Sequence, residues 1–151
     1  MGWLPRGGLR NMSKKLSLAA AMLAGLAVSS GAVWSHGDVQ PQEIKTDGLP
    51  SLGEEWKDEN PYRGNALAVK IGASGYNQNC ARCHGLEVIS GGLAPDLRYL
   101  DKGKDGDAWF KERVTHGAII NGVTKMPVFA GVLSQEGLWA IRTFIESKHE
   151  E

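Results

Sequence analysis

The stretch Cys80-Ala81-Arg82-Cys83-His84 decides how the rest of the chain is interpreted. Its two cysteines are the only ones among the 151 residues. Side chains at positions i and i+3 of a helix lie on one side of it, so both thiols can reach the same partner. C-x-x-C-H is the attachment signature of a c-type haem, in which the two thiols bond to one porphyrin and the histidine faces its iron. The spacing therefore predicts one covalent haem c, attached through Cys80 and Cys83, with His84 as an iron ligand.

Other sites share the C-x-x-C part of this motif. Thioredoxin-like redox centres and zinc knuckles both use it. A four-cysteine zinc site is excluded by the cysteine count, and no βαβ pattern surrounds the motif. A structural disulfide between Cys80 and Cys83 is the remaining alternative, but it would leave the adjacent His84 unexplained.

Residues 1–35 have the pattern of a secretory signal peptide. Lys14 and Lys15 precede an uncharged apolar run over 16–28, and small residues follow at 29–32. Cleavage is expected after Ala32 or Ser35, and Met12 is a better start than Met1. The run is shorter than the roughly 20 residues of a membrane span, although an uncleaved anchor is the alternative. We therefore expect a periplasmic protein with no stable membrane insertion after cleavage.

The second iron ligand follows partly by elimination. Three of the four methionines (Met1, Met12 and Met22) fall in the expected signal peptide, which leaves Met126 in the mature chain. Pro127 stiffens the loop beside it, which suits a ligand that must reach the iron at a fixed angle. A core-filling methionine is the alternative for Met126, and His116 is the rival ligand, so bis-histidine ligation stays open.

The charge of the chain argues against nucleic-acid binding. The 17 basic and 17 acidic residues cancel. Loss of residues 1–35 removes Arg6, Arg10, Lys14 and Lys15 but no acidic residue, which leaves a net charge of −4. A mildly acidic protein is a poor ligand for a phosphate backbone, so no nucleic-acid partner is expected.

Two stretches follow the signal peptide. Residues 36–65 are polar, rich in proline and glycine, and without helical periodicity, so we expect an extended arm, pinned to the domain by Trp56 and Tyr62. Residues 66–151 are expected to form an all-α domain with long loops and no strands. Long loops in a small domain need a large apolar group to pack against, and a haem would serve.

Three helices are expected in this domain. The first spans about 66–81, and the second begins at Asp105 or Asp107 as N-cap and runs toward His116. The third is capped by Ser134, with Glu136 in its first turn. Its apolar stripe consists of Leu138, Ile141, Phe144 and Ile145.

From residue 66 onward the sequence resembles the class I cytochromes c. The resemblance rests on three motifs: Gly72-x-x-x-Tyr76-x-x-x-Cys80, Ala94-Pro95-Asp96-Leu97 and Lys125-Met126-Pro127. It implies the class I fold wrapped around one haem, with Gly72 crossing the last helix near Ile141 and Phe144. It also implies that the Pro95 carbonyl accepts the second N–H of His84. Arg98 and Trp109 are candidates for contacts with the haem propionates, against the alternatives of a solvated charge and a core aromatic.

A closer resemblance links the chain to the PedF-type cytochromes, which accept electrons from alcohol dehydrogenases that use pyrroloquinoline quinone (PQQ). Four segments carry it: His36-Gly37-Asp38-Val39, Gly53-Glu54-Glu55-Trp56, Asn60-Pro61-Tyr62-Arg63-Gly64-Asn65 and Tyr76-Asn77-Gln78-Asn79-Cys80. The resemblance implies a PQQ-dependent alcohol dehydrogenase as donor and a terminal oxidase or another cytochrome as acceptor.

The favoured hypothesis is therefore a periplasmic one-electron carrier and not an enzyme, because ligation by both His84 and Met126 leaves no open position on iron. Two alternatives remain. One is a haem enzyme or gas sensor, which requires an open sixth position. The other is a cytochrome subunit fixed in a dehydrogenase complex, with the arm of residues 36–65 as the contact.

Overall fold

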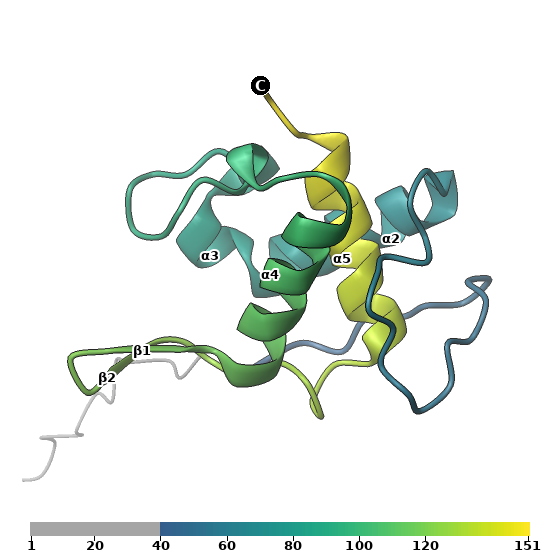
Figure 1. The fold of residues 1–151 in the computed structure, drawn as a ribbon, viewed down its shortest axis with the longest axis horizontal. Helices are drawn as coiled ribbons and strands as arrows, with labels where there is room; N and C mark the ends of the chain where they lie inside the picture. The colour runs from purple at the N-terminus through teal and green to yellow at the C-terminus, as the bar shows by residue number, and fades with distance from the viewer. Residues whose placement is uncertain (1–39) are drawn as a thin grey trace, which may run out of the picture. The chain divides into compact units, whose positions relative to one another are not determined.

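The computed structural model describes residues 40–151. The predicted signal peptide and the first four residues of the arm lie outside this range. Within it, the helices are α2 (Ala66–Asn79), α3 (Ala81–His84), α4 (Gly103–His116) and α5 (Gln135–Ser147), with short 3-10 helices η2 (Leu86–Val88) and η3 (Leu97–Tyr99). In Figure 1, α5 passes between α4 in front and α2 behind. None of the helices in residues 40–151 is long and apolar enough to cross a membrane.

Helix α2 begins at a side-chain cap. The Asn65 carboxamide oxygen accepts hydrogen bonds from the backbone N–H groups of Leu67 and Ala68, at 2.9 and 3.1 Å. Such a cap satisfies donors that have no partner within the helix. The helix expected over about 66–81 is confirmed, with a break at Cys80 that separates it from α3. The two helices together carry the whole C-x-x-C-H motif.

The crossing of α2 and α5 requires a glycine. A Cβ added to Gly72 would lie 1.9 Å from the carbonyl oxygen of Ala140, so any side chain at this position would force the helices apart. The close approach expected at Gly72 is therefore confirmed, but its partner is the Ala140 backbone. The expected partners, Ile141 and Phe144 of α5, contact later residues of α2. Ile141 packs over Gly75, and Phe144 packs on Tyr76 with ring centroids 5.4 Å apart.

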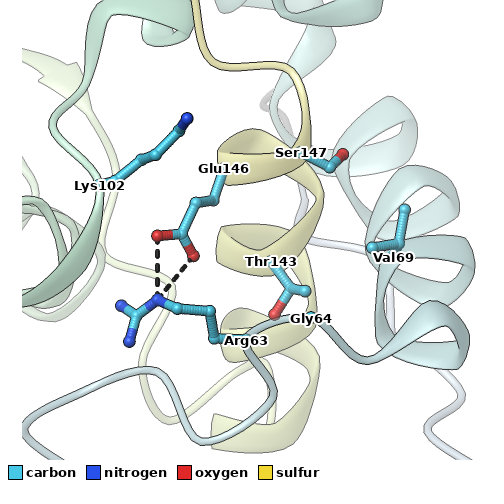
Figure 2. Close-up of a pocket in the computed structure, with 7 residues that line it drawn as sticks. All are labelled: Arg63, Gly64, Val69, Lys102, Thr143, Glu146 and Ser147. Carbon is cyan, nitrogen blue, oxygen red and sulfur yellow. Dashed lines mark hydrogen bonds and ion pairs between the residues drawn. The ribbon is translucent and has the colours of Figure 1, made fainter.

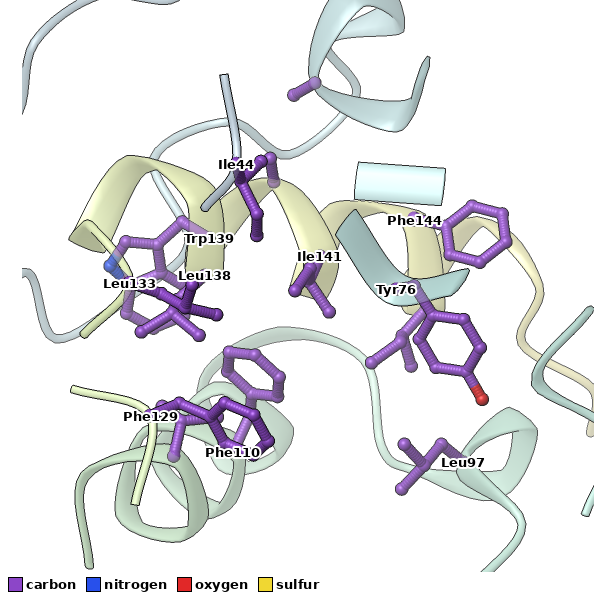
Figure 3. Close-up of a cluster of buried hydrophobic side chains, with 14 of the residues drawn as sticks. Ile44, Tyr76, Leu97, Phe110, Phe129, Leu133, Leu138, Trp139, Ile141 and Phe144 are labelled. Carbon is purple, nitrogen blue, oxygen red and sulfur yellow. The ribbon is translucent and has the colours of Figure 1, made fainter. Parts of the chain in front are cut away.

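Helix α5 lies at the centre of the hydrophobic core. Its cap is confirmed, since the Ser134 hydroxyl accepts from the Gly137 N–H at 3.1 Å. The expected apolar stripe is buried, but so are Trp139 and Arg142, both at 0% exposure. Figure 3 shows why: Tyr76 meets Phe144 at one end of the helix, and Phe110 of α4 lies below Trp139 at the other, with ring centroids 6.0 Å apart. The helix is covered on several sides, which a single stripe does not predict.

Helix α4 begins earlier than expected. Its N-cap is Lys102, which provides no side-chain hydrogen bond, so the prediction that Asp105 or Asp107 caps the helix is wrong. Asp105 lies in the first turn. Asp107 is fully buried, and its carboxylate pairs with Arg142 at 2.8 Å. The carboxylate stabilises a buried charge on α5 and is therefore not available as a cap.

The arm is pinned to the helices, as expected. Tyr62 is 3% exposed, and its hydroxyl donates to the Pro50 carbonyl. Trp56 packs edge-on against Trp139, with ring centroids 6.4 Å apart. The Asn60 N–H donates to Asp107 at 2.8 Å. Residues 40–65 thus contribute to the same core as the helices.

A short hairpin departs from the prediction that the domain has no strands. Strands β1 (Ala118–Ile120) and β2 (Val123–Met126) pair antiparallel through a turn at Asn121 and Gly122, both with positive φ. An Asn-Gly pair favours this two-residue turn because both residues tolerate left-handed backbone. The hairpin projects from the helices in Figure 1. The all-α class holds, with this hairpin as an addition.

We predict that Asp107→Asn destabilises the fold by about 3 kcal/mol, because it leaves the buried Arg142 without its counter-charge. The matched control is Asp58→Asn. Asp58 also pairs with a cation, Lys111, but its side chain is 92% exposed, so solvent screens the pair and the loss of stability should be much smaller. Denaturant unfolding of both variants measures the difference. Equal losses would contradict the role assigned to Asp107.

Candidate haem site

The two cysteines lie at the junction of α2 and α3. Both are half-buried free thiols, so the structure does not contain the disulfide considered as an alternative. Burial raises the pKa of the Cys80 thiol to about 12, and the neighbouring Cys83 adds to this effect. A thiol that stays protonated at neutral pH is a poor nucleophile, which argues against thiol–disulfide exchange at this motif.

His84 ends α3 with its ring held in one orientation. The side chain is buried, and its Nδ1 lies 2.9 Å from the carbonyl oxygen of Pro95. A carbonyl oxygen only accepts, so Nδ1 carries the proton and the lone pair is on Nε2. This is the tautomer in which a histidine binds a metal through Nε2 while a backbone carbonyl orients it.

The backbone just after His84 is tightly packed. A Cβ on Gly85 would lie 1.7 Å from the Ile89 carbonyl oxygen, and φ of Gly85 is +83°, so only glycine fits. The Tyr76 hydroxyl donates to the Gly85 carbonyl at 2.9 Å. Burial raises the pKa of Tyr76 above its ordinary value, so this group remains a donor. Tyr76 thereby ties the end of the histidine-bearing helix to the core.

Met126 is the last residue of β2 and is half-buried against the core. It pairs with Ala118 in the hairpin, whereas Ile120 pairs with Val123, and a bulge separates the two pairs. Opposed residues share a face, and faces alternate along β1. Ala118 and Ile120, with their partners Met126 and Val123, therefore lie on one face of the hairpin, and Ile119 lies on the other.

The distribution of exposed apolar side chains fits a haem between these elements. Seven of the eleven large apolar side chains exposed within residues 40–151 lie in two segments, one after the motif and one around Met126. They are Leu86, Ile89 and Leu93 in the first segment, and Ile119, Ile120, Val123 and Val128 in the second. Large apolar side chains left exposed in a few segments are candidates for burial against a ligand or partner. With two thiols, an oriented imidazole and a thioether, the exposed residues after the motif and those on the Met126 face of the hairpin fit a covalent porphyrin.

The other candidates lie at the surface. The His116 side chain is 70% exposed, and its Nδ1 lies 3.0 Å from a Glu112 carboxylate oxygen. Arg98 is paired with Asp96 and Glu150. Trp109 is partly exposed and lies under the guanidinium of Arg113, 5.7 Å from the ring centroid. The structure thus gives Arg98 and Trp109 partners within the chain.

A separate cavity of about 280 Å³ lies beside α5 and contains none of the candidate residues. Figure 2 shows Arg63 and Glu146 paired at its rim. Arg63 Nε lies 3.0 Å from Glu146, which also accepts from the Gly103 N–H at 3.0 Å. These charges join the arm to α4 and α5, so we assign this cavity no ligand.

The comparisons with known proteins agree with this geometry. The family described as cytochrome C oxidase, cbb3-type, subunit III matches residues 67–145. Cytochrome c550 of Pseudomonas aeruginosa is 61% identical over 132 residues, which cover 85% of this chain and 90% of that protein. No solved structure is significantly similar to the chain.

Two larger proteins match the cytochrome part. Quinohemoprotein alcohol dehydrogenase ADH IIB of Pseudomonas putida is 36% identical over 86 residues, which cover 55% of this chain and 11% of the enzyme. Quinohemoprotein alcohol dehydrogenase ADH-IIG of the same species is 32% identical over 81 residues, which cover 54% of this chain and 11% of the enzyme.

A helical domain with one C-x-x-C-H motif, whose histidine is held in one orientation, defines a protein with one covalent haem. The chain belongs to the class I c-type cytochromes. Its cofactor is accordingly haem c with iron, and it is an electron-transfer protein and not an enzyme.

The residue that fixes the loop whose Pro95 carbonyl binds His84 was not identified from the sequence. Asp96 caps η3 and closes the loop before it: its carboxylate accepts from the N–H groups of Arg98 and Ser90, at 3.0 and 3.2 Å. An aspartate just before a short helical turn is a local signal for such a cap, which could have been used.

We predict that Asp96 stabilises the fold in a pH-dependent manner. Hydrogen bonds from the Arg98 side chain lower the pKa of Asp96 to about 2, against the opposing effect of burial. A lowered pKa contributes stability that is present above the ordinary value of 3.8 and lost as the pH falls toward 2. The difference in unfolding free energy between wild type and Asp96→Asn should therefore shrink over that range.

Denaturant unfolding at a series of pH values measures this difference. Glu54→Gln, which changes the charge equally at an exposed position of the arm, is the control. A difference between wild type and Asp96→Asn that stays constant from about pH 6 to about pH 2 would contradict the assignment.

Proposed function

We propose that the chain carries one haem c bonded to Cys80 and Cys83, with His84 and Met126 as the iron ligands. The observation that carries this proposal is the fixed ring of His84, whose Nδ1 is 2.9 Å from the Pro95 carbonyl oxygen, which leaves Nε2 with a lone pair that can bind a metal. When bound, the haem supplies a one-electron iron couple. A thioether as second ligand raises its reduction potential relative to a second histidine.

The residues of the chain then have three tasks. The Pro95 carbonyl holds His84 in one tautomer and orientation. The thioether of Met126 would bind the iron as its second ligand from the chain and so leave no coordination site for a substrate. The apolar side chains after the motif (Leu86, Ile89 and Leu93), with Ile120 and Val123 on the Met126 face of the hairpin, would exclude water from a bound haem.

We further propose a PQQ-dependent alcohol dehydrogenase as electron donor. Two proteins named quinohemoprotein alcohol dehydrogenase resemble this chain in a segment of about 80 to 90 residues. By their names they combine a quinone, a haem and alcohol oxidation. An enzyme of this kind could pass its electrons to a separate haem protein, and a carrier whose domain resembles the enzyme's own is a suitable acceptor. The acceptor would be a terminal oxidase or another cytochrome, and the location the periplasm.

Two alternatives lose support from contacts within the chain. The arm is held by its own domain: Gln135 accepts from the Lys57 N–H at 2.8 Å, and Glu136 accepts from the Leu52 N–H at 2.8 Å. An arm so occupied is a poor candidate for the main contact of a fixed dehydrogenase subunit. His116 is paired with Glu112 at the surface, which disfavours bis-histidine ligation.

We predict that Met126→Ala abolishes the weak near-infrared sulfur-to-iron band of the oxidised protein and lets the reduced iron bind carbon monoxide. The sixth position is then open because alanine cannot coordinate. His116→Ala is the control and should leave both spectra unchanged. Absorption spectroscopy, with mass spectrometry to confirm attached haem, measures both. If His116→Ala opens the iron and Met126→Ala does not, the ligand assignment is wrong.

We also predict rapid reduction by a quinoprotein alcohol dehydrogenase during turnover with a primary alcohol. Stopped-flow absorption of the oxidised cytochrome follows the reaction, and the same enzyme without PQQ is the control. Failure of the active enzyme to reduce a cytochrome that ascorbate reduces would contradict this donor while leaving the haem assignment intact.

A further inference from the structure

The segment after α5 contacts both loops that flank His84. Lys148 Nζ lies 2.7 Å from a Glu87 carboxylate oxygen in the loop just after the motif. Glu150 reaches η3, directly after Pro95: its N–H donates to the Arg98 carbonyl at 3.1 Å, and its carboxylate lies 2.8 Å from Arg98 Nη1. Residues 148–150 therefore connect the end of the core helix to the side of the site where His84 lies.

Arg98 joins this segment to the proline loop. Its guanidinium binds Asp96 through Nη2 at 2.9 Å and Nε at 3.1 Å. Because Nη1 binds Glu150, the guanidinium pairs with both carboxylates at the same time. The side chains of Arg98 and Asp96 are only 18% and 21% exposed. A guanidinium with two carboxylate partners, one of them bidentate, has a defined orientation.

Asp96 in turn fixes the loop that contains Pro95. One carboxylate oxygen accepts from the Ser90 N–H at 3.2 Å, and the Ser90 hydroxyl donates to the Ala94 carbonyl. Residues 90–96 are thus closed on themselves around the carbonyl that binds His84. The chain of contacts runs without a gap from Glu150 through Arg98 and Asp96 to the Pro95 loop.

We propose that Glu150 and Arg98 are positioning residues, which set the hydrogen bond from His84 to Pro95 and through it the reduction potential. This inference rests on the proposed function, in which His84 binds iron. A strong bond from Nδ1–H gives the imidazole more anionic character, and a more basic ligand favours oxidised iron. Loosening the loop weakens that bond and raises the potential.

A competing anchor exists in Leu97, which is 6% exposed and holds η3 in the core. A single buried side chain fixes the depth of η3 but not the direction of the closed loop before it. The two carboxylate partners of Arg98 fix that direction relative to the segment after α5. The Glu150 side chain is 52% exposed, and an ion pair made by so exposed a group contributes little to global stability, so the effect of losing Glu150 is expected in the geometry at His84 and not in the unfolding free energy.

The experiment compares Glu150→Gln with Glu151→Gln in the haem-loaded protein. Both remove one negative charge, at adjacent exposed positions, but only Glu150 pairs with Arg98. Arg98→Lys is the second variant, because it keeps the charge and loses the planar fork. Two quantities are measured: the midpoint potential, and the exchange rate of the His84 Nδ1 proton by NMR.

We expect Glu150→Gln to raise the midpoint potential more than Glu151→Gln, and Arg98→Lys to raise it with no change in net charge. Both should speed exchange of the Nδ1 proton severalfold, and Glu150→Gln should do so with little change in the unfolding free energy. Equal potentials and unchanged exchange in Glu150→Gln and Arg98→Lys would overturn the proposal.

A result that overturns the positioning role of Glu150 and Arg98 can be distinguished from one that overturns the proposed function. The near-infrared band reports whether Met126 binds iron, and it should persist in all three variants. The exchange rate of the Nδ1 proton depends on the Pro95 contact and therefore reports on the positioning residues whichever group is the sixth ligand.

Discussion

The backbones of α2 and α5 touch at Gly72, and the placement of the haem motif depends on this contact. The crossing sets the direction in which α2 delivers Cys80, Cys83 and His84. Tyr76 extends its effect, because one side of the ring packs on Phe144 of α5 while the hydroxyl binds the carbonyl of Gly85. The packing of the two helices thus affects the position of Gly85, the residue after His84, through these two contacts of Tyr76.

The second residue that we propose to bind iron comes from a different part of the chain. Met126 is the last residue of β2, at the base of the hairpin and away from its turn, and apolar side chains around it are exposed, as they are after His84. In a small domain, exposed apolar side chains of this kind on two segments favour a further apolar group packed against them, in addition to the core around α5. The covalent haem of the family provides one, so the cofactor is part of the core as well as the redox centre.

The arm and a pair of buried charges hold α4 and α5 together. Asp107 of α4 binds Arg142 of α5 and the backbone of Asn60 in the arm, all away from solvent. Breaking such a pair is costly, since the remaining charge stays buried. These contacts therefore fix α4, α5 and the arm to one another.

Features that depend on neighbouring residues could be predicted from the sequence, whereas contacts between distant segments could not. The motif at Cys80–His84, the cap at Ser134 and the apolar stripe of α5 depend on neighbouring residues, and the structure has all of them. The hairpin had a local signal in Asn121-Gly122, but its strands are too short to show alternation. Asp107 has the sequence pattern of a helix cap because its partner Arg142 becomes visible only when α4 packs on α5. The pairing of Arg98 with Glu150 likewise joins residues far apart in the chain.

The central claim is that one haem is held between His84 and Met126. It is tested most directly by the proton NMR spectrum of the reduced protein. A methionine methyl group bound to haem iron lies over the porphyrin ring, whose current displaces its resonance far upfield. We predict one three-proton singlet in that region, assigned to Met126 by its loss in Met126→Ala. A reduced spectrum without this singlet, with signals of a second bound imidazole, would contradict the account.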